Sequence, residues 1–185
     1  MKKIVIRHGI RTHGEKSTDL LADDMAASGW RIYNPDDLGK AKARNATRKA
    51  REFARKMLSH VNDGDHAIGH SQGCLTLLEL MRLGVRFDKV IFIAAAVDSD
   101  VLFPRNAYTR LVNIHNPKDV ALVAGALLPK SGMGAMGRVG YKGESLNVRD
   151  LERVSRKGPF NHSRPYFRGE GYKWLLRFCK RQCPM

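Results

Sequence analysis

The sequence predicts an α/β fold built on a mostly parallel central sheet of about six strands, with helices on both faces. Short apolar segments, typical of strands buried in a parallel sheet, alternate along the chain with longer segments whose apolar residues recur at helical spacing. A glycine-flanked serine lies where one such strand meets a helix. Because 185 residues suit one ordinary domain, we expect a single domain that spans 1–185.

The first half of the chain is expected to alternate strands with helices. The strands are the short apolar segments 2–7, 30–33 and 65–69. A helix over 19–28 follows a serine and a threonine that can cap it. A second helix, from about 41 to 60, places alanines and a phenylalanine on one face at three- and four-residue steps. The third is apolar nearly all round from Leu75 to Met81 and ends at Gly84, so we expect it to be buried.

The second half is expected to continue this alternation. Strands are predicted at 89–96, about 109–115 and 145–151, and helices at 120–127 and about 169–180. A glycine-rich segment over 131–141 is expected to be a flexible loop. The segment 159–166 is expected to be a loop as well, because Pro165 excludes a helix there.

The sequence Gly-His-Ser-Gln-Gly at 69–73 has the pattern of a nucleophile elbow. An apolar strand leads into it and an apolar helix leads out. Glycines two positions before and after Ser71 carry no Cβ, so two chain segments can pass close together there. We therefore expect Ser71 to present its Oγ above the edge of the sheet as the nucleophile. The backbone N–H of Gln72, at the positive end of the helix, suits a developing oxyanion.

The other candidate groups follow the carboxyl ends of predicted strands, where open α/β sheets place their active sites. Asp119 follows a buried strand at the start of a helix, and we expect it to be the acid. Asp98 and Asp100, one strand earlier, are the alternatives. His162 lies in a loop after the last expected strand and is the expected general base. The N–H of Ile10, after the first strand, is the second expected oxyanion donor.

Loop residues are expected to contact the substrate. His8 and Gly9 follow the first strand, beside the expected oxyanion donor. In the glycine-rich segment, Met133, Met136 and Tyr141 can cover an apolar acyl pocket. We expect no metal site, since no acidic residue accompanies the loop histidines at a metal-binding spacing, and the expected chemistry needs no cofactor.

The chain is strongly basic. Its 33 Lys and Arg residues against 18 Asp and Glu residues give a net charge of +15. Such a field attracts anionic partners, and the helix over 41–60 carries many cations on one face. Because the basic residues are spread along the chain without interleaved aromatics, we expect weak binding to anionic surfaces and no specific nucleic acid.

Cysteine usage and the amino-terminal segment bear on the compartment. The 3 cysteines have no metal-binding spacing and are odd in number, which fits a reducing compartment. The apolar run after Lys3 is too short for the core of a signal peptide. We therefore expect a cytoplasmic protein. The oligomeric state is left open.

In these motifs the chain resembles the α/β-hydrolase superfamily, as a small serine esterase or lipase-like member of bacterial or phage type. The order Ser71, Asp119, His162 is the family's order of nucleophile, acid and histidine. The elbow is similar to the family's, and His8–Gly9 fits its oxyanion loop. The resemblance covers nearly the whole chain and implies a sheet without the family's first two strands. Only 97–108 is available where the family often inserts a lid, so no large lid is implied.

The resemblance implies a serine hydrolase that cleaves a carboxylic ester or thioester through an acyl-enzyme on Ser71, with His162 as base and Asp119 as the orienting acid. Its substrate would be a small-molecule or lipid-like acyl ester. The alternative interpretation is a non-enzymatic basic module that binds nucleic acid, an anionic partner or a membrane. A third interpretation is an esterase that docks on an anionic membrane through its basic helix.

Overall fold

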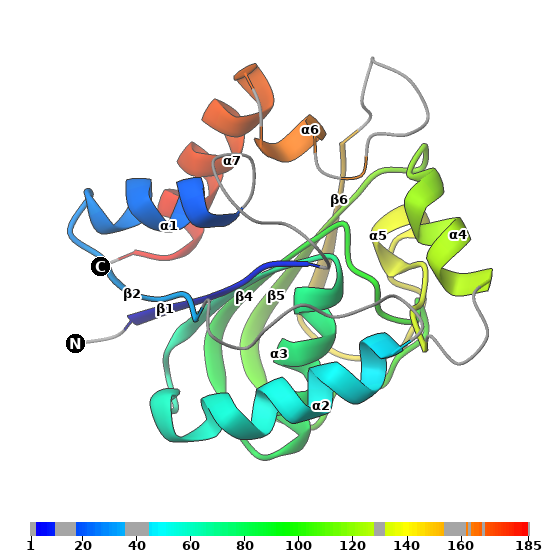
Figure 1. Cartoon of the computed structure of the whole chain (residues 1–185), viewed down its shortest axis with the longest axis horizontal. Helices are drawn as coiled ribbons and strands as arrows, with labels where there is room; N and C mark the ends of the chain where they lie inside the picture. The colour runs from blue at the N-terminus through cyan, green and yellow to red at the C-terminus, as the bar shows by residue number, and fades with distance from the viewer. Residues whose placement is uncertain are drawn as a thin grey trace.

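Six strands form one parallel sheet through the middle of the molecule (Figure 1). The computed structural model describes residues 3–9, 18–35, 45–127, 132–153, 162, 164–167 and 169–184. The strands are β1 (Lys3–Arg7), β2 (Arg31–Tyr33), β3 (His66–His70), β4 (Phe87–Ile93), β5 (Tyr108–His115) and β6 (Val148–Glu152). Each neighbouring pair is parallel, so the predicted fold class is confirmed.

The strand order changes direction at β1. In the sheet order β2-β1-β3-β4-β5-β6, the chain first adds β2 on one side of β1 and then crosses to the other side for β3. From there it continues outward to β6. Because parallel crossovers are right-handed, connections that leave in opposite directions along the sheet put their helices on opposite faces.

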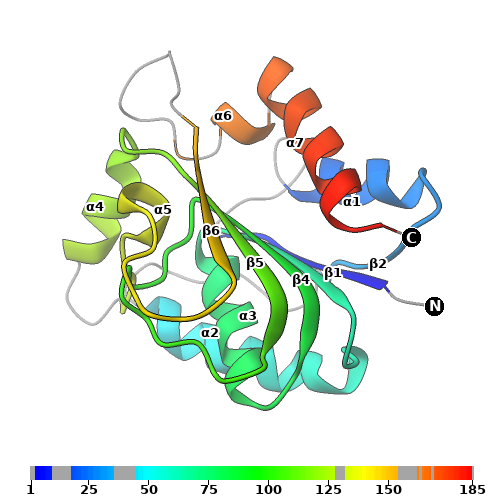
Figure 2. The same ribbon diagram turned by 180° about the vertical axis from the view of Figure 1, so that it is seen from behind.

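The helices accordingly form a layer on each face of the sheet (Figures 1 and 2). One layer holds α1 (Thr18–Ala26), α6 (Arg164–Phe167) and α7 (Gly169–Gln182). The other holds α2 (Ala46–Met57) with a 3-10 turn at Leu58–His60, α3 (Gln72–Arg82), and residues of α4 (Val120–Leu127) and α5 (Met136–Val139). None of the helices in the described ranges is long and apolar enough to cross a membrane.

Several predicted boundaries differ from the structure by up to three residues, among them that of the last strand, expected at 145–151 and found at Val148–Glu152. The fourth strand ends at Ile93 and not at Ala96, because Ala94 has a φ of 47°, outside the range of a strand. The basic helix begins at Ala46 within the described residues, and its α-helical part ends at Met57. Residues 41–44 of that prediction lie outside the described part of the chain.

The expectation of a flexible loop over 131–141 is wrong where the structure describes that segment. Met136–Val139 form α5, and the N–H of Gly137 donates to Ala95 O at 2.8 Å. A Cβ at Gly137 would lie 2.1 Å from Ala95 N. The glycine therefore lets this segment pack directly against the chain after β4. Composition alone does not distinguish such a close approach from flexibility.

The exclusion of a helix at Pro165 is also wrong. Helix α6 spans Arg164–Phe167, with the proline as its second residue. In the first turn of a helix the missing N–H has no intrahelical acceptor, so a proline there does not disturb the hydrogen bonding. Tyr166 and Phe167 are buried and join the core beneath α7.

The first turn of α3 packs on the end of β1 through Gly73. A Cβ there would lie 2.1 Å from Arg7 O, so Gly73→Ala forces the helix away from the sheet. We expect this variant to lose about 3 kcal/mol of the free energy of unfolding in urea titrations. Gly64→Ala is the control, because nothing lies within 4 Å of the Cβ added there, although Gly64 has a positive φ of 85°. It should lose only about 1 kcal/mol of backbone strain. Equal losses would contradict tight packing at Gly73.

Candidate functional site

The carboxyl ends of β1 and β3 lie side by side where the strand order changes direction. In open α/β sheets the loops diverge at such a point and leave a crevice in which ligands bind. His8 and Gly9 follow β1, and Ser71 follows β3. The topology thus brings these predicted site residues to one edge of the sheet.

Ser71 lies in a strained turn between β3 and α3. Its φ of 53° and ψ of −123° are values that residues with a side chain rarely adopt. The neighbouring chain holds this turn, since Ser71 N donates to Ile93 O at 2.9 Å and Ser71 O accepts from Ala96 N at 3.2 Å. Gly9 makes room on the other side, because a Cβ there would lie 2.7 Å from Ser71 Cβ. The strand, the strained turn and the helix have the arrangement of a nucleophile elbow.

Asp119 and His162 are in contact, with 2.6 Å between Asp119 Oδ2 and His162 Nδ1. Asp119 is fully buried before α4, and its Oδ1 accepts from Leu122 N at 3.3 Å. Because an ionised carboxylate only accepts hydrogen bonds, Nδ1 carries the proton and leaves Nε2 of the neutral ring able to accept one. Asp98 and Asp100, the alternative acids, have exposed side chains on the loop after β4.

The paired imidazole lies beside the turn that carries Ser71. The ring of His162 is 5.0 Å, between centroids, from the ring of His70, which directly precedes Ser71. Among the described residues, no hydrogen bond joins Ser71 Oγ to His162. Such contacts are often long without substrate and shorten when it binds. The structure therefore joins Asp119 to His162 and brings the pair next to the elbow.

Gln72 follows Ser71 as the first residue of α3. Its backbone N–H belongs to the first turn, where N–H groups lack an intrahelical acceptor. Its buried side chain donates from Nε2 to Ala46 O at 3.2 Å and so ties the elbow to α2. The side chain is therefore structural, and the N–H is the group available for the predicted role. Ile10, the second predicted oxyanion donor, lies outside the described residues.

Most residues predicted to contact substrate make contacts within the protein. His8 is 4% exposed, and both of its ring nitrogens lie within hydrogen-bond distance of protein atoms. Met133 and Met136 belong to the core that α2 and α3 cover. The hydroxyl of Tyr141 is engaged in two hydrogen bonds within the chain. These contacts do not support the expected acyl pocket, whereas Gly9 does lie against Ser71.

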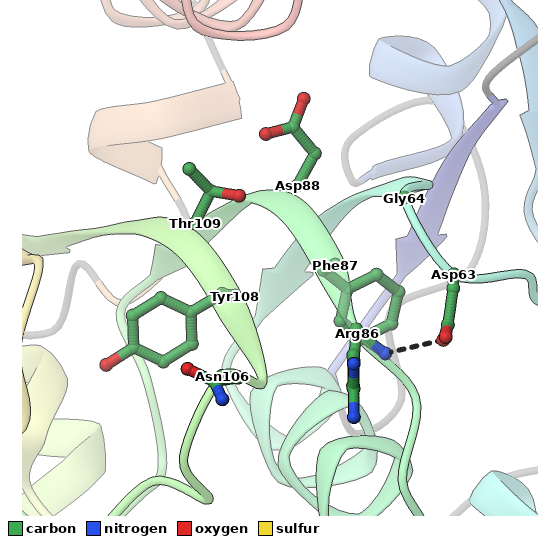
Figure 3. Close-up of a pocket in the computed structure, with 8 residues that line it drawn as sticks. All are labelled: Asp63, Gly64, Arg86, Phe87, Asp88, Asn106, Tyr108 and Thr109. Atoms are coloured by element: carbon green, nitrogen blue, oxygen red, sulfur yellow. Dashed lines mark hydrogen bonds between the residues drawn. The ribbon is translucent and has the colours of Figure 1, made fainter.

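Three cavities, of about 720, 700 and 350 Å³, are lined by residues other than Ser71, Asp119 and His162. One of about 720 Å³ lies beside the amino ends of β4 and β5, at the opposite edge of the sheet (Figure 3). Its side chains diverge, with Asp88 and Thr109 on one side of the strands and Arg86 on the other. It therefore lacks the convergent polar groups of a ligand site. Nor does any group of three or more His, Cys, Asp or Glu in the described ranges form a metal site.

The basic helix α2 carries its cations on the solvent side, but several are paired. Arg48 and Lys49 contact Glu52 at 2.9 and 2.5 Å, and Arg51 lies 3.5 Å from Glu79. These carboxylates offset part of the positive charge of this face. Binding of an anionic surface through α2 stays a prediction.

Proteins of known structure share this fold, although no protein-family model and no curated protein matches the sequence. The lin2722 gene product of Listeria innocua is 9% identical, over 98% of this chain and 93% of its own, with a TM-score of 0.55. A protein of Thermoplasma acidophilum, described as a predicted CIB-like hydrolase, is 16% identical over 97% and 86%, with a TM-score of 0.55. A Pectobacterium atrosepticum protein, provisionally described as a YdeN-like hydrolase, is 15% identical over 100% and 94%, with a TM-score of 0.50.

At these identities the likeness concerns the fold. It extends over nearly the whole chain, as the resemblance in sequence does, and it includes proteins described as hydrolases. The chain therefore shares the α/β fold of these proteins, some of which are described as hydrolases.

Proposed function

We propose that the chain is a serine hydrolase that cleaves a carboxylic ester or thioester through an acyl-enzyme on Ser71. The observation that carries the proposal is the 2.6 Å contact between buried Asp119 and His162, beside a serine at a strained turn after a strand. Hydrolases among the proteins that share the fold add support.

In the proposed mechanism, His162 Nε2 accepts the hydroxyl proton of Ser71 as Oγ attacks the carbonyl carbon. Asp119 orients the ring through Nδ1–H and stabilises the imidazolium. The N–H groups of Gln72 and Ile10 bind the negative charge that develops on the carbonyl oxygen. The imidazolium then gives its proton to the leaving alcohol or thiol. A water molecule that His162 deprotonates then attacks the acyl carbon, and His162 returns the proton to Ser71 Oγ as the bond to the acyl group breaks and the carboxylic acid leaves.

The chemistry of the leaving group favours an ester or a thioester as the proposed substrate. An amine has to be protonated while it leaves, whereas an alcohol or a thiol is a better leaving group. The segment 97–108, which is too short to form a lid domain, is compatible with a small-molecule or lipid-like acyl ester.

His70 adds a second imidazole next to the proposed base. It is fully buried, and its ring lies 5.0 Å from those of His162 and Phe167. Burial lowers the pKa of His70 well below its ordinary value, and a positive charge on His162 or His8 lowers it further when either ring is protonated. A neutral His70 puts no positive charge against the imidazolium that the mechanism forms on His162.

Substitution of Asp119 tests the proposed acid. We expect Asp119→Asn to lower kcat/KM for a p-nitrophenyl ester by about 10³–10⁴-fold, because the amide no longer holds the Nδ1–H tautomer and cannot stabilise the imidazolium. Release of p-nitrophenolate measures the rate. Asp98→Asn and Asp100→Asn are matched controls and should hydrolyse at the native rate. A loss in either control, with Asp119→Asn still active, would reassign the acid.

His70 should also make stability depend on pH. Because its pKa is lowered on folding, the unfolded chain binds more protons below the ordinary value of 6.5, and the folded state loses stability as the pH falls through that range. His70→Phe keeps a ring and removes the titration. From pH 7 to pH 5 we expect the variant to lose less stability than the native chain, by up to about 1.4 kcal/mol per pH unit below 6.5. Urea titrations at both pH values measure this, and equal pH dependence would contradict a buried neutral His70.

A further inference from the structure

Arg7 places a buried cation at the carboxyl end of β1, next to the candidate site. It is only 1% exposed, and its side chain is among the largest that are fully buried. Removing a guanidinium from water is costly unless its N–H groups find acceptors. The groups that the guanidinium of Arg7 contacts therefore indicate its role beside the candidate site.

Arg7 reaches both the loop after β1 and the layer that contains α2. Its Nη1 lies 3.1 Å from His8 Nε2 and 3.2 Å from Pro35 O. The guanidinium carbon lies 4.7 Å from the centre of the Phe53 ring, whose π face attracts a cation. Arg7 is thus held in place with an N–H group directed at His8.

This contact determines which nitrogen of His8 carries the proton. A guanidinium has donors only, so His8 Nε2 has to accept. A neutral imidazole that accepts at Nε2 carries its proton on Nδ1. His8 Nδ1 lies 2.9 Å from Gly9 O, which can only accept. Both contacts therefore require the same tautomer, with the proton on Nδ1.

The bond to Gly9 O orients the peptide group that leads into the next part of the loop. In a trans peptide group the N–H points away from the carbonyl oxygen, so a bond that fixes this oxygen also fixes the following N–H. That N–H belongs to Ile10 and is the second proposed oxyanion donor. The bond also engages a carbonyl oxygen that would repel an oxyanion if it turned toward Ser71.

We propose that Arg7 and His8 are positioning residues for the oxyanion loop: Arg7 selects the Nδ1–H tautomer of His8, and His8 holds the Gly9 carbonyl. The inference rests on the proposed hydrolase function and extends it to residues that do not touch the reacting atoms. Their loss should lower kcat and leave KM nearly unchanged, because the contact that they set strengthens only in the transition state.

Paired substitutions of His8 separate its two contacts. The amide nitrogen of Asn takes the place of Nδ1, and the amide of Gln takes the place of Nε2. We expect His8→Asn to retain kcat within about threefold, and His8→Gln and Arg7→Met to lower it by about tenfold or more, since loss of a whole oxyanion donor costs about 10²–10³-fold. Adding Arg7→Met to His8→Asn should lower kcat little further, because the amide of Asn has no tautomers between which Arg7 could select. Arg55→Met, on the exposed face of α2, is the control, and circular dichroism tests folding.

NMR reads the tautomer independently of catalysis. Long-range ¹H–¹⁵N spectra of the native chain should show His8 protonated on Nδ1 alone, and Arg7→Met should mix the two tautomers. If Arg7→Met does not fold, the kcat values of the two His8 variants and the spectrum of the native chain still test the positioning role.

The outcomes distinguish the inference from the function on which it rests. An Nε2–H tautomer in an active enzyme, or equal losses of kcat in His8→Asn and His8→Gln, would overturn the positioning role alone. A folded native chain whose Ser71 does not react with a fluorophosphonate would overturn the proposed function and the positioning role together, whatever the tautomer.

Discussion

The backbone turn at Ser71 is the constraint on which the rest of the site depends. A residue with a side chain in this conformation costs about 1–3 kcal/mol, and it persists only where the surroundings hold it. Here they do so from two directions. Ile93 and Ala96 bond the backbone of the turn from the β4 side, while Gly9 approaches it from the end of β1. Residues at the carboxyl ends of β1, β3 and β4 thus pack together and hold the backbone of Ser71 in this conformation.

The groups around this turn have their protons placed by their neighbours. The Asp119 carboxylate accepts from Nδ1 of His162, so that the neutral form of this ring presents Nε2 as an acceptor. On the other side, the Arg7 guanidinium donates to Nε2 of His8, which puts that proton on Nδ1. Burial favours the neutral form of His70, whose ring lies beside that of His162. Three imidazoles near one serine are thus oriented by their neighbours, and electrostatic catalysis depends on such preorganisation.

Local patterns in the sequence were sufficient to predict the elbow and the contact between the proposed acid and the proposed base. The glycines around Ser71 and the apolar runs beside it are adjacent in sequence. Asp119 and His162 are not, but both follow predicted strands, and parallel strands end at one edge. Their contact is present, and their catalytic roles remain proposals.

The features that were predicted incorrectly from the sequence depend on tertiary contacts. Whether Gly137 marks a flexible loop or a close approach is decided by Ala95, which lies far from it in sequence. Met133 and Met136 become core residues for the same reason, because that approach carries them beneath the sheet. The role of Arg7 could not be predicted from the sequence either, because one of its hydrogen-bond acceptors, Pro35 O, comes near it only in the folded chain.

The most direct test of the central claim is covalent labelling of the native chain with a fluorophosphonate, followed by intact-mass and peptide mass spectrometry. We predict one adduct, located on Ser71, and none on folded Ser71→Ala. Absence of any adduct on the folded native chain between about pH 6 and 9, or an adduct located elsewhere, would contradict it.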